Sequence, residues 1–186
     1  MITSDLKEKL SLSAYEYAEK YNLSITSEIG SGVSGVAFVT DTNTVIKITT
    51  SKPECDYAKA VFEALKQGKT ILRCANIYDI VNVTYNYKQE KKEAYIITQE
   101  LLDTSIKDED IRKLEERLNE SGYEFEDIKW MPDKCADYVD KNQIPLVKEI
   151  TQVFDELEHI GVWSDEVLHG NIGVRNGLIA VFDQET

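Results

Sequence analysis

Runs of β-branched and aromatic residues alternate with polar residues in the first half of the chain, which is the pattern of half-buried strands. Five such runs occur, and they cover residues 24–29, 36–40, 44–49, 77–87 and 94–102. Residues that favour turns separate them: Asp41-Thr42-Asn43 lies between the second and third runs, and the charged residues 88–92 lie between the last two. We therefore predict a small antiparallel sheet built largely from hairpins.

Helices are predicted by apolar residues that recur every three or four positions. Residues 4–22, 53–67 and 145–160 show this period, and residues 107–120 are highly charged and helical in composition. Pro53 and Pro145 begin two of these segments, and Gly68 and Gly161 follow their ends, as these residue types favour. Residues 122–142 mix aromatic and acidic side chains without a period, so no element is predicted there.

The end of the chain carries the strongest hairpin signal. Asn176-Gly177 separates the apolar runs 172–175 and 178–182, and this dipeptide fits the tightest hairpin turns. Strands thus gather early in the chain and helices late, which indicates an α+β fold with a small sheet lobe followed by a reduced, mainly helical lobe. The predicted parts are an N-terminal helix at 1–22, the sheet lobe at 23–102 and the helical lobe at 103–186.

The net charge of the chain excludes one class of function. Asp and Glu total 34 and Lys and Arg total 21 in 186 residues, giving a formal charge of −13. A protein that binds nucleic acid by neutralising phosphates is excluded on this ground, and any bound phosphate must be held by a few local groups or by a metal. An acidic surface usually serves solubility, and the other interpretation is a surface that meets a basic partner.

Composition also bears on compartment and metal chemistry. Three widely spaced cysteines without a CxxC pair indicate reduced thiols, and two histidines without an HExxH motif disfavour a zinc hydrolase. No stretch has the length of about 20 apolar residues that a membrane span needs. The first residues lack the apolar core of a signal peptide. We therefore expect a cytoplasmic protein without direct membrane contact.

Three glycines have the spacing GxGxxG at Gly30, Gly32 and Gly35. A dinucleotide-binding fold would place a helix after them, whereas here a second predicted strand follows, as in the loop that covers the phosphates in kinases. Glycine allows backbone amides to approach phosphate oxygens because no Cβ intervenes. A merely flexible turn is the alternative interpretation of this motif.

Lys47 lies on the third predicted strand between the apolar residues Ile46 and Ile48. A lysine on a buried strand needs a partner. We predict that its partner is Glu54 of the next helix. Glu54 precedes Ala58 by four positions and so lies on the helix face that carries the apolar residues. The alternative is that Glu54 is a first-turn acid that only complements the helix dipole.

Asn171 and Asp183 stand at the two open ends of the predicted C-terminal hairpin, so strand pairing would bring them together. An amide oxygen and a carboxylate are hard oxygen ligands that suit Mg²⁺.

In this order the motifs resemble the protein-kinase-like fold, in a minimal form similar to small kinase-like proteins of bacteria and bacteriophages. The resemblance runs from about residue 25 to residue 183 and omits residues 103–143. It implies ATP and Mg²⁺ as cofactors, with the backbone of Glu100 and Leu102 reading the adenine edge in a hinge, Ala37 and Val45 covering the ring, and Asn171 and Asp183 holding the metal. The residues implied to bind nucleotide are Gly30, Gly32, Gly35, Ala37, Val45, Lys47, Glu54, Glu100 and Leu102.

The chain departs from the family pattern at the catalytic base. The family places its aspartate five residues before the metal-binding asparagine, where this chain has Glu166, and Asp165 stands six before. Either residue is a candidate base, with His169 as a residue that orients the loop or simply packs in it. A register with Asn171 as base and Asn176 as metal ligand is rejected because it breaks the hairpin.

Two further departures concern the residues around Asp183. Asp183-Gln184-Glu185 replaces D-F-G, and no activation segment follows in the sequence, which disfavours a peptide substrate held as in regulated kinases.

Two function classes follow from these residues. One is an ATP- and Mg²⁺-dependent phosphotransferase acting on a hydroxyl of a protein or small molecule. The other is a catalytically weak or inactive kinase-like module (a pseudokinase) whose acidic surface binds a partner such as a host defence protein, in the host cytoplasm if the protein is phage-encoded. Lys47, Asn171 and Asp183 favour the enzyme, whereas the displaced base and the charge of −13 favour the module.

Overall fold

The computed structural model describes residues 2–104, 108–162 and 171–182. The chain forms two units, which are described separately. Residues 1–66 and 76–101 make up the first, here called the sheet unit, and residues 67–75 and 102–186 make up the second, the helical unit. The segment 67–75 therefore belongs to the helical unit although both of its neighbours in sequence belong to the sheet unit.

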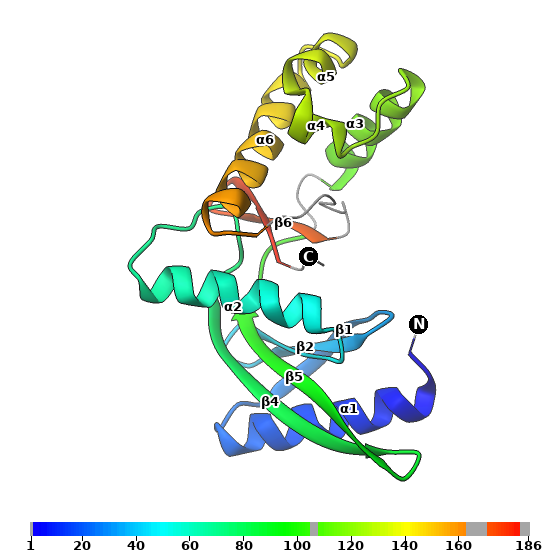
Figure 1. Ribbon diagram of the computed structural model, residues 1–186, viewed down its shortest axis with the longest axis vertical. Helices are drawn as coiled ribbons and strands as arrows, with labels where there is room; N and C mark the ends of the chain where they lie inside the picture. Colours follow the sequence, from blue (N-terminus) through cyan, green and yellow to red (C-terminus); the bar gives the residue numbers. More distant parts are fainter. Residues whose placement is uncertain (1, 105–107, 163–170, 183–186) are drawn as a thin grey trace. The chain divides into compact units, whose positions relative to one another are not determined.

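The sheet unit contains a five-stranded antiparallel sheet (Figure 1). Its strands are β1 (Ile25–Ser31), β2 (Gly35–Thr40), β3 (Thr44–Thr49), β4 (Ile77–Tyr87) and β5 (Glu90–Glu100). They lie in the order β1-β2-β3-β5-β4, so β3 and β5 are interior strands and β1 and β4 are the edges. The predicted α+β class and the five-stranded antiparallel sheet are confirmed.

Helices cover both faces of this sheet. Helix α1 (Ser4–Lys20) is capped by the Thr3 side chain and packs its buried apolar residues against one face. That interface consists of Leu10, Ala14, Tyr17 and Ala18 against Val36, Phe38, Ile46, Ile48, Ala94 and Ile96. Helix α2 (Lys52–Lys66) lies on the other side of the sheet (Figure 1). Its buried residues include Tyr57 and Val61. Alternation along β3 fixes this arrangement, because Ile46 and Ile48 face α1 while Lys47 faces α2.

Two strand boundaries differ from the prediction. Strand β1 continues through Gly30 to Ser31, and β5 begins at Glu90 rather than near residue 94. The second difference arises at Lys88 and Gln89, which adopt φ values of 51° and 65°. Two consecutive residues with positive φ form a two-residue hairpin turn, so pairing extends to Tyr87 and Glu90. A lysine and a glutamine rarely take this conformation, and the sequence signal for it was therefore absent.

The helical unit combines four helices of the described residues with a short hairpin. The helices are α3 (Asp108–Glu120), α4 (Asp127–Trp130), α5 (Pro132–Tyr138) and α6 (Ile144–His159). The predicted helices at 107–120 and 145–160 are confirmed within one residue at each end. The short helices α4 and α5 occupy the region without a period, and both lie against α6. The largest fully buried side chains of this unit are Leu114, Leu118, Ile128, Ile150, Leu157 and Ile179.

The C-terminal hairpin consists of β6 (Ile172–Arg175) and β7 (Leu178–Val181). Asn176 and Gly177 form its turn with φ values of 52° and 81°, as the Asn-Gly signal predicted. Within the described residues, no helix combines the length and the apolar character needed to cross a membrane.

Candidate functional site

Lys47 lies at the centre of the sheet. It is paired with Ala37 of β2 on one side and with Ile97 of β5 on the other. Residues directly opposite one another in an antiparallel sheet point to the same face. Lys47 therefore projects from the face that α1 does not cover, with a small side chain and an apolar one beside it.

Glu54 is the partner of this lysine. The Lys47 Nζ atom lies 2.7 Å from Glu54 Oε2, and the two side chains are 13% and 8% exposed. Ser51 fixes the start of α2 because its hydroxyl oxygen accepts a hydrogen bond of 3.3 Å from the backbone N–H of Glu54. The predicted ion pair is confirmed, and Glu54 also occupies the first turn of the helix, where its charge complements the dipole.

Burial of both side chains raises the free-energy cost of forming this ion pair. Glu54 Oε2 is enclosed and has no hydrogen bond of aligned geometry among the described residues, so the Lys47 ammonium is the contact that compensates for its lost hydration. Burying two charges costs several kcal/mol per ion unless their geometry is good. Removal of either partner would leave the other charge buried without this compensation.

Ala37 and Val45 lie on the face of the sheet from which Lys47 projects. Val45 is paired with both Val39 and Gln99, in the row of the sheet next to that of Ala37 and Lys47. Val45 is buried and Ala37 is half-buried. Both face the same side as Lys47, so this face offers an apolar surface beside a buried cation.

The three glycines have different structural roles. A Cβ on Gly35 would lie 2.3 Å from the carbonyl oxygen of Ile48, so the close approach of β2 to β3 requires glycine at this position. A Cβ on Gly30 or Gly32 would meet nothing within 4 Å. The turn closes through a hydrogen bond of 3.0 Å from Gly32 N–H to the Gly35 carbonyl, and Val33 at its tip is 78% exposed. Strand packing therefore explains why residue 35 is glycine, whereas a bound ligand would have to explain the glycines at Gly30 and Gly32.

The predicted hinge residues fall in different units. Glu100 ends β5, where its N–H donates to the Asn76 carbonyl at 2.8 Å and its carboxylate accepts from the Asn76 N–H at 3.1 Å. Leu102 belongs to the helical unit and is buried there with Ala75 and Ala180. The Glu100 side chain therefore has a local role at the start of β4.

Of the predicted metal ligands and bases, Asn171 alone lies within the described residues. It is half-buried, and its carbonyl accepts a hydrogen bond of 3.1 Å from Phe182 N–H, so the hairpin is closed at this end. Asp165, Glu166, His169 and Asp183 lie outside the described residues. The amide oxygen of Asn171 suits Mg²⁺, and the described residues contain no group of three or more His, Cys, Asp or Glu side chains that could hold a metal.

All three cysteines are free and buried. Burial raises the pKa of the Cys55 and Cys135 thiols above their ordinary value. A raised pKa reduces the fraction of thiolate, so these two residues are not suited to act as nucleophiles.

Sequence reasoning missed Arg73, a buried arginine of the helical unit. Its side chain is 9% exposed, and Nη1 lies 3.4 Å from Glu149 Oε2. It also donates to the backbone carbonyl of Ile179 at 3.3 Å and to the Gln152 side chain. Arg73 lies in an irregular segment, where periodicity gives no signal.

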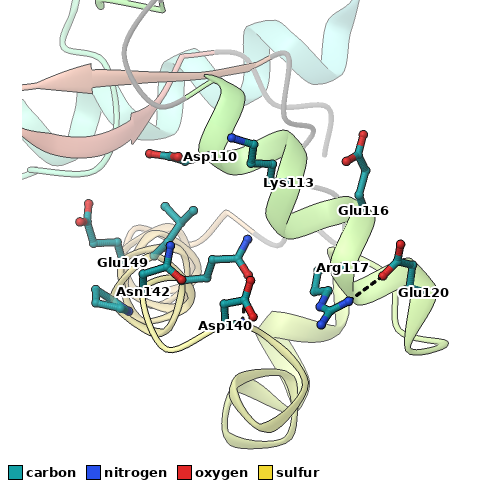
Figure 2. A pocket seen from close by; sticks show the side chains of 11 residues that line it. Asp110, Lys113, Glu116, Arg117, Glu120, Asp140, Asn142 and Glu149 are labelled. Carbon is teal, nitrogen blue, oxygen red and sulfur yellow. Dashed lines mark hydrogen bonds and ion pairs between the residues drawn. The ribbon is translucent and has the colours of Figure 1, made fainter.

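A pocket of about 570 Å³ lies within the helical unit (Figure 2). Its lining residues are Asp110, Lys113, Glu116, Arg117, Glu120, Asp140, Asn142, Gln143, Pro145, Leu146 and Glu149. Five of them are acidic and two are basic, and Arg117 is paired with Glu120 at 2.9 Å (Figure 2). Among the predicted site residues that the structure describes, neither Asn171 nor any of the nucleotide-binding set lines this pocket.

No protein-family model matches the chain, and no curated protein matches it in sequence. Support for the candidate site therefore comes from its residues and from their arrangement within each unit.

Proposed function

We propose that the protein is a kinase-like phosphotransferase that uses ATP and Mg²⁺ to phosphorylate a hydroxyl group of a protein or small molecule. The observation that carries this proposal is the buried ion pair of Lys47 and Glu54, beside Ala37 and Val45 on one face of the sheet. A strand lysine is normally solvated. An ammonium that a carboxylate holds in place is pre-organised to bind phosphate oxygens.

Each residue has a distinct role in this proposal. Lys47 binds the phosphates of ATP, and the backbone around Gly30 and Gly32 covers them. Asn171 and Asp183 hold Mg²⁺, which when bound supplies charge neutralisation on the phosphates. Asp165 or Glu166 accepts the proton of the attacking hydroxyl.

Thermal unfolding with ATP, with and without Mg²⁺, tests nucleotide binding. A ligand at 100 times its Kd stabilises the folded state by about 2.7 kcal/mol, which gives a clear shift of Tm. Lys47→Ala should abolish this shift. The matched control is Lys52→Ala, which removes an exposed lysine paired with Asp56 in the same unit and should leave the shift unchanged. An equal ATP-induced shift in Lys47→Ala and the wild type would contradict the phosphate role of Lys47.

The acidic pocket of the helical unit favours a second candidate, the kinase-like interaction module. Its excess of carboxylates suits a basic partner, and it contains no residue of the proposed nucleotide site. The two candidates are separated by transfer of labelled γ-phosphate from ATP to water, to the protein or to an acceptor. A wild-type protein without transfer, together with full biological activity of Asp183→Ala, would favour the module over the enzyme.

A further inference from the structure

Arg73 connects three segments of the helical unit. Its guanidinium contacts Glu149 and Gln152 of α6 and the Ile179 carbonyl of β7. The backbone of the same segment is held as well, since Leu72 N–H donates to Glu156 Oε2 at 2.9 Å and Arg73 N–H donates to Glu156 Oε1. A buried arginine with this many acceptors fixes the position of each segment that supplies one.

Glu149 completes the connection between α6 and the hairpin. Its Oε2 atom accepts from Arg73 and also from the backbone N–H of Ile179 at 3.2 Å. The carboxylate therefore bonds the hairpin directly and through the arginine. A rotation of the hairpin against α6 would break both contacts.

Backbone hydrogen bonds hold both edges of the hairpin. On the β7 edge, Val181 N–H donates to the Arg73 carbonyl at 2.8 Å, and Ala75 N–H donates to the Val181 carbonyl at 2.7 Å. On the β6 edge, Asp103 and Val174 exchange hydrogen bonds of 3.3 and 2.9 Å. Strand β6 also approaches Leu102 closely, since a Cβ on Gly173 would lie 2.6 Å from the Leu102 Cβ.

We infer that Arg73 is a positioning residue for the metal-binding end of this hairpin. The inference rests on the proposed function, in which Asn171 is a Mg²⁺ ligand. Asn171 directly precedes β6, and its carbonyl is bonded to Phe182 N–H at the open end of the hairpin. The Arg73 backbone carbonyl bonds Val181 beside this end, and the Arg73 guanidinium bonds Ile179 two residues earlier, so the side chain holds the strand that leads to this end. Groups that orient a metal ligand without touching the metal typically affect metal affinity by about 10–100-fold. Arg73 acts through β7 and β6, and no direct contact with nucleotide is assigned to it.

The test uses the full chain, ATP and Mn²⁺ as a paramagnetic probe. Mn²⁺ is titrated into the ATP-saturated protein, and the broadening of the Asn171 side-chain amide signals is followed by NMR. Arg73→Met should require about 10–100-fold more Mn²⁺ for the same broadening. Its affinity for ATP without metal should stay that of the wild type, because Lys47 and the glycine turn belong to the sheet unit.

Two variants act as controls. Arg112→Met removes an exposed arginine paired with Glu109 and Glu116, and it should leave the Mn²⁺ titration unchanged. Gln152→Met deletes one acceptor of Arg73 and keeps the side-chain volume, so it tests the network if Arg73→Met does not fold. It should shift the Mn²⁺ titration in the same direction by a smaller factor.

The outcomes distinguish the inference from the proposed function. In one outcome, the Asn171 signals of the wild type broaden with Mn²⁺, and those of folded Arg73→Met or Gln152→Met broaden at the same Mn²⁺ concentrations. This outcome overturns the positioning role alone. Equal loss of metal-free and metal-dependent ATP binding in both variants also overturns it, because a general structural role would have that effect. A wild type without Mn²⁺-dependent broadening overturns the metal role of Asn171 and the inference with it.

Discussion

The two units hold their buried polar groups in different ways. In the sheet unit, the partners come from regular elements: Lys47 of β3 meets Glu54 of α2, and the Tyr17 hydroxyl of α1 bonds Thr98 of β5 and Asp79 of β4. In the helical unit, the central group is Arg73, which lies in the irregular segment 67–75. The first kind of contact follows from the repeat of a strand or helix, and the second does not.

This difference has an energetic consequence. Lys47 and Glu54 form an ion pair at 2.7 Å, so replacing both together removes the two opposite charges of that contact at once. Arg73 shares its guanidinium among two side chains and a carbonyl, so no single second substitution compensates for its loss. The comparison predicts that the sheet unit tolerates a paired substitution that the helical unit does not.

The largest effect is expected for Lys47→Met. This substitution leaves the Glu54 carboxylate buried without its cation, and breaking such a pair typically lowers the free energy of unfolding by about 3–5 kcal/mol. ATP binding should be lost at the same time. Urea unfolding and a nucleotide titration measure the two effects.

The double variant Lys47→Met/Glu54→Leu separates stability from function. With both charges replaced by apolar groups, most of the lost stability should return, because a buried ion pair is often no more stable than apolar residues of similar volume. ATP binding should stay lost. Recovery of ATP binding in the double variant would show that the pair serves the fold alone.

A second, pH-dependent effect is expected at Tyr17. Burial raises the pKa of its phenol to about 12, with the hydrogen bond to Asp79 acting in the same direction. The unfolded chain, with a pKa near 10, releases this proton first, so stability is lost as pH rises from about 10 to 12.

Urea unfolding at pH 9 and pH 11.5 measures this loss, and Tyr17→Phe is the control. The phenylalanine variant cannot titrate, so its stability should fall less between the two pH values. A slope equal to that of the wild type would assign the alkaline destabilisation to other groups such as Tyr85, whose pKa burial also raises.

The sequence predicted most of the sheet unit because its contacts repeat with the backbone. Alternation identified the strands, and the positions of Lys47 and Glu54 on a strand and a helix face were enough to predict their ion pair. The failures are local. Lys88 and Gln89 adopt positive φ without glycine or asparagine, so the extent of the β4–β5 hairpin was underestimated.

The helical unit was predictable only where it is regular. The α6 stripe and the Asn176-Gly177 turn were identified, but α4 and α5 span 4 and 7 residues, too few for a period to emerge. The contacts of Arg73 join residues up to 106 positions apart, and no local pattern encodes them. The candidate site was therefore predicted in its sheet-unit part and not in the network around the hairpin.

A smaller effect is expected when the glycines of the turn are compared. Gly35→Ala places a methyl group against the Ile48 carbonyl, and overpacking of this kind costs about 1–3 kcal/mol of stability. Gly32→Ala meets no atom and should change stability by less than about 0.5 kcal/mol. If the turn covers phosphates, Gly32→Ala should instead weaken ATP binding.

Urea unfolding and nucleotide titration of the two variants test this division of roles. Gly32→Ala with wild-type ATP affinity would identify the motif as a simple turn, which is the alternative interpretation of its spacing.

A destabilisation no larger than that of Gly35→Ala is expected at the hairpin turns, and its location tests whether the units unfold separately. Gly177→Ala forces alanine into a backbone with φ of 81°, at a cost of about 1 kcal/mol. Asn43→Ala is the matched variant in the sheet unit, since Asn43 has φ of 56° in the β2–β3 turn. Amide hydrogen exchange shows which part of the chain each substitution destabilises.

If the two units are independent, Gly177→Ala should speed exchange at Val174 and Val181 and leave the β3 amides at their wild-type rates. Asn43→Ala should do the reverse, speeding exchange in β3. Within each unit, the cost should also reach the irregular segment that is bonded to the hairpin. Val181 bonds the segment that carries Arg73, so Gly177→Ala should loosen the amide of Ala75 as well. Asp41 N–H of the β2–β3 turn donates to the Ser24 carbonyl at 2.8 Å, so Asn43→Ala should loosen the amide of Asp41. Acceleration of β3 and Val181 amides by the same factor in both variants would mean that the two units open as one cooperative structure, and the distinction between them would then be architectural only.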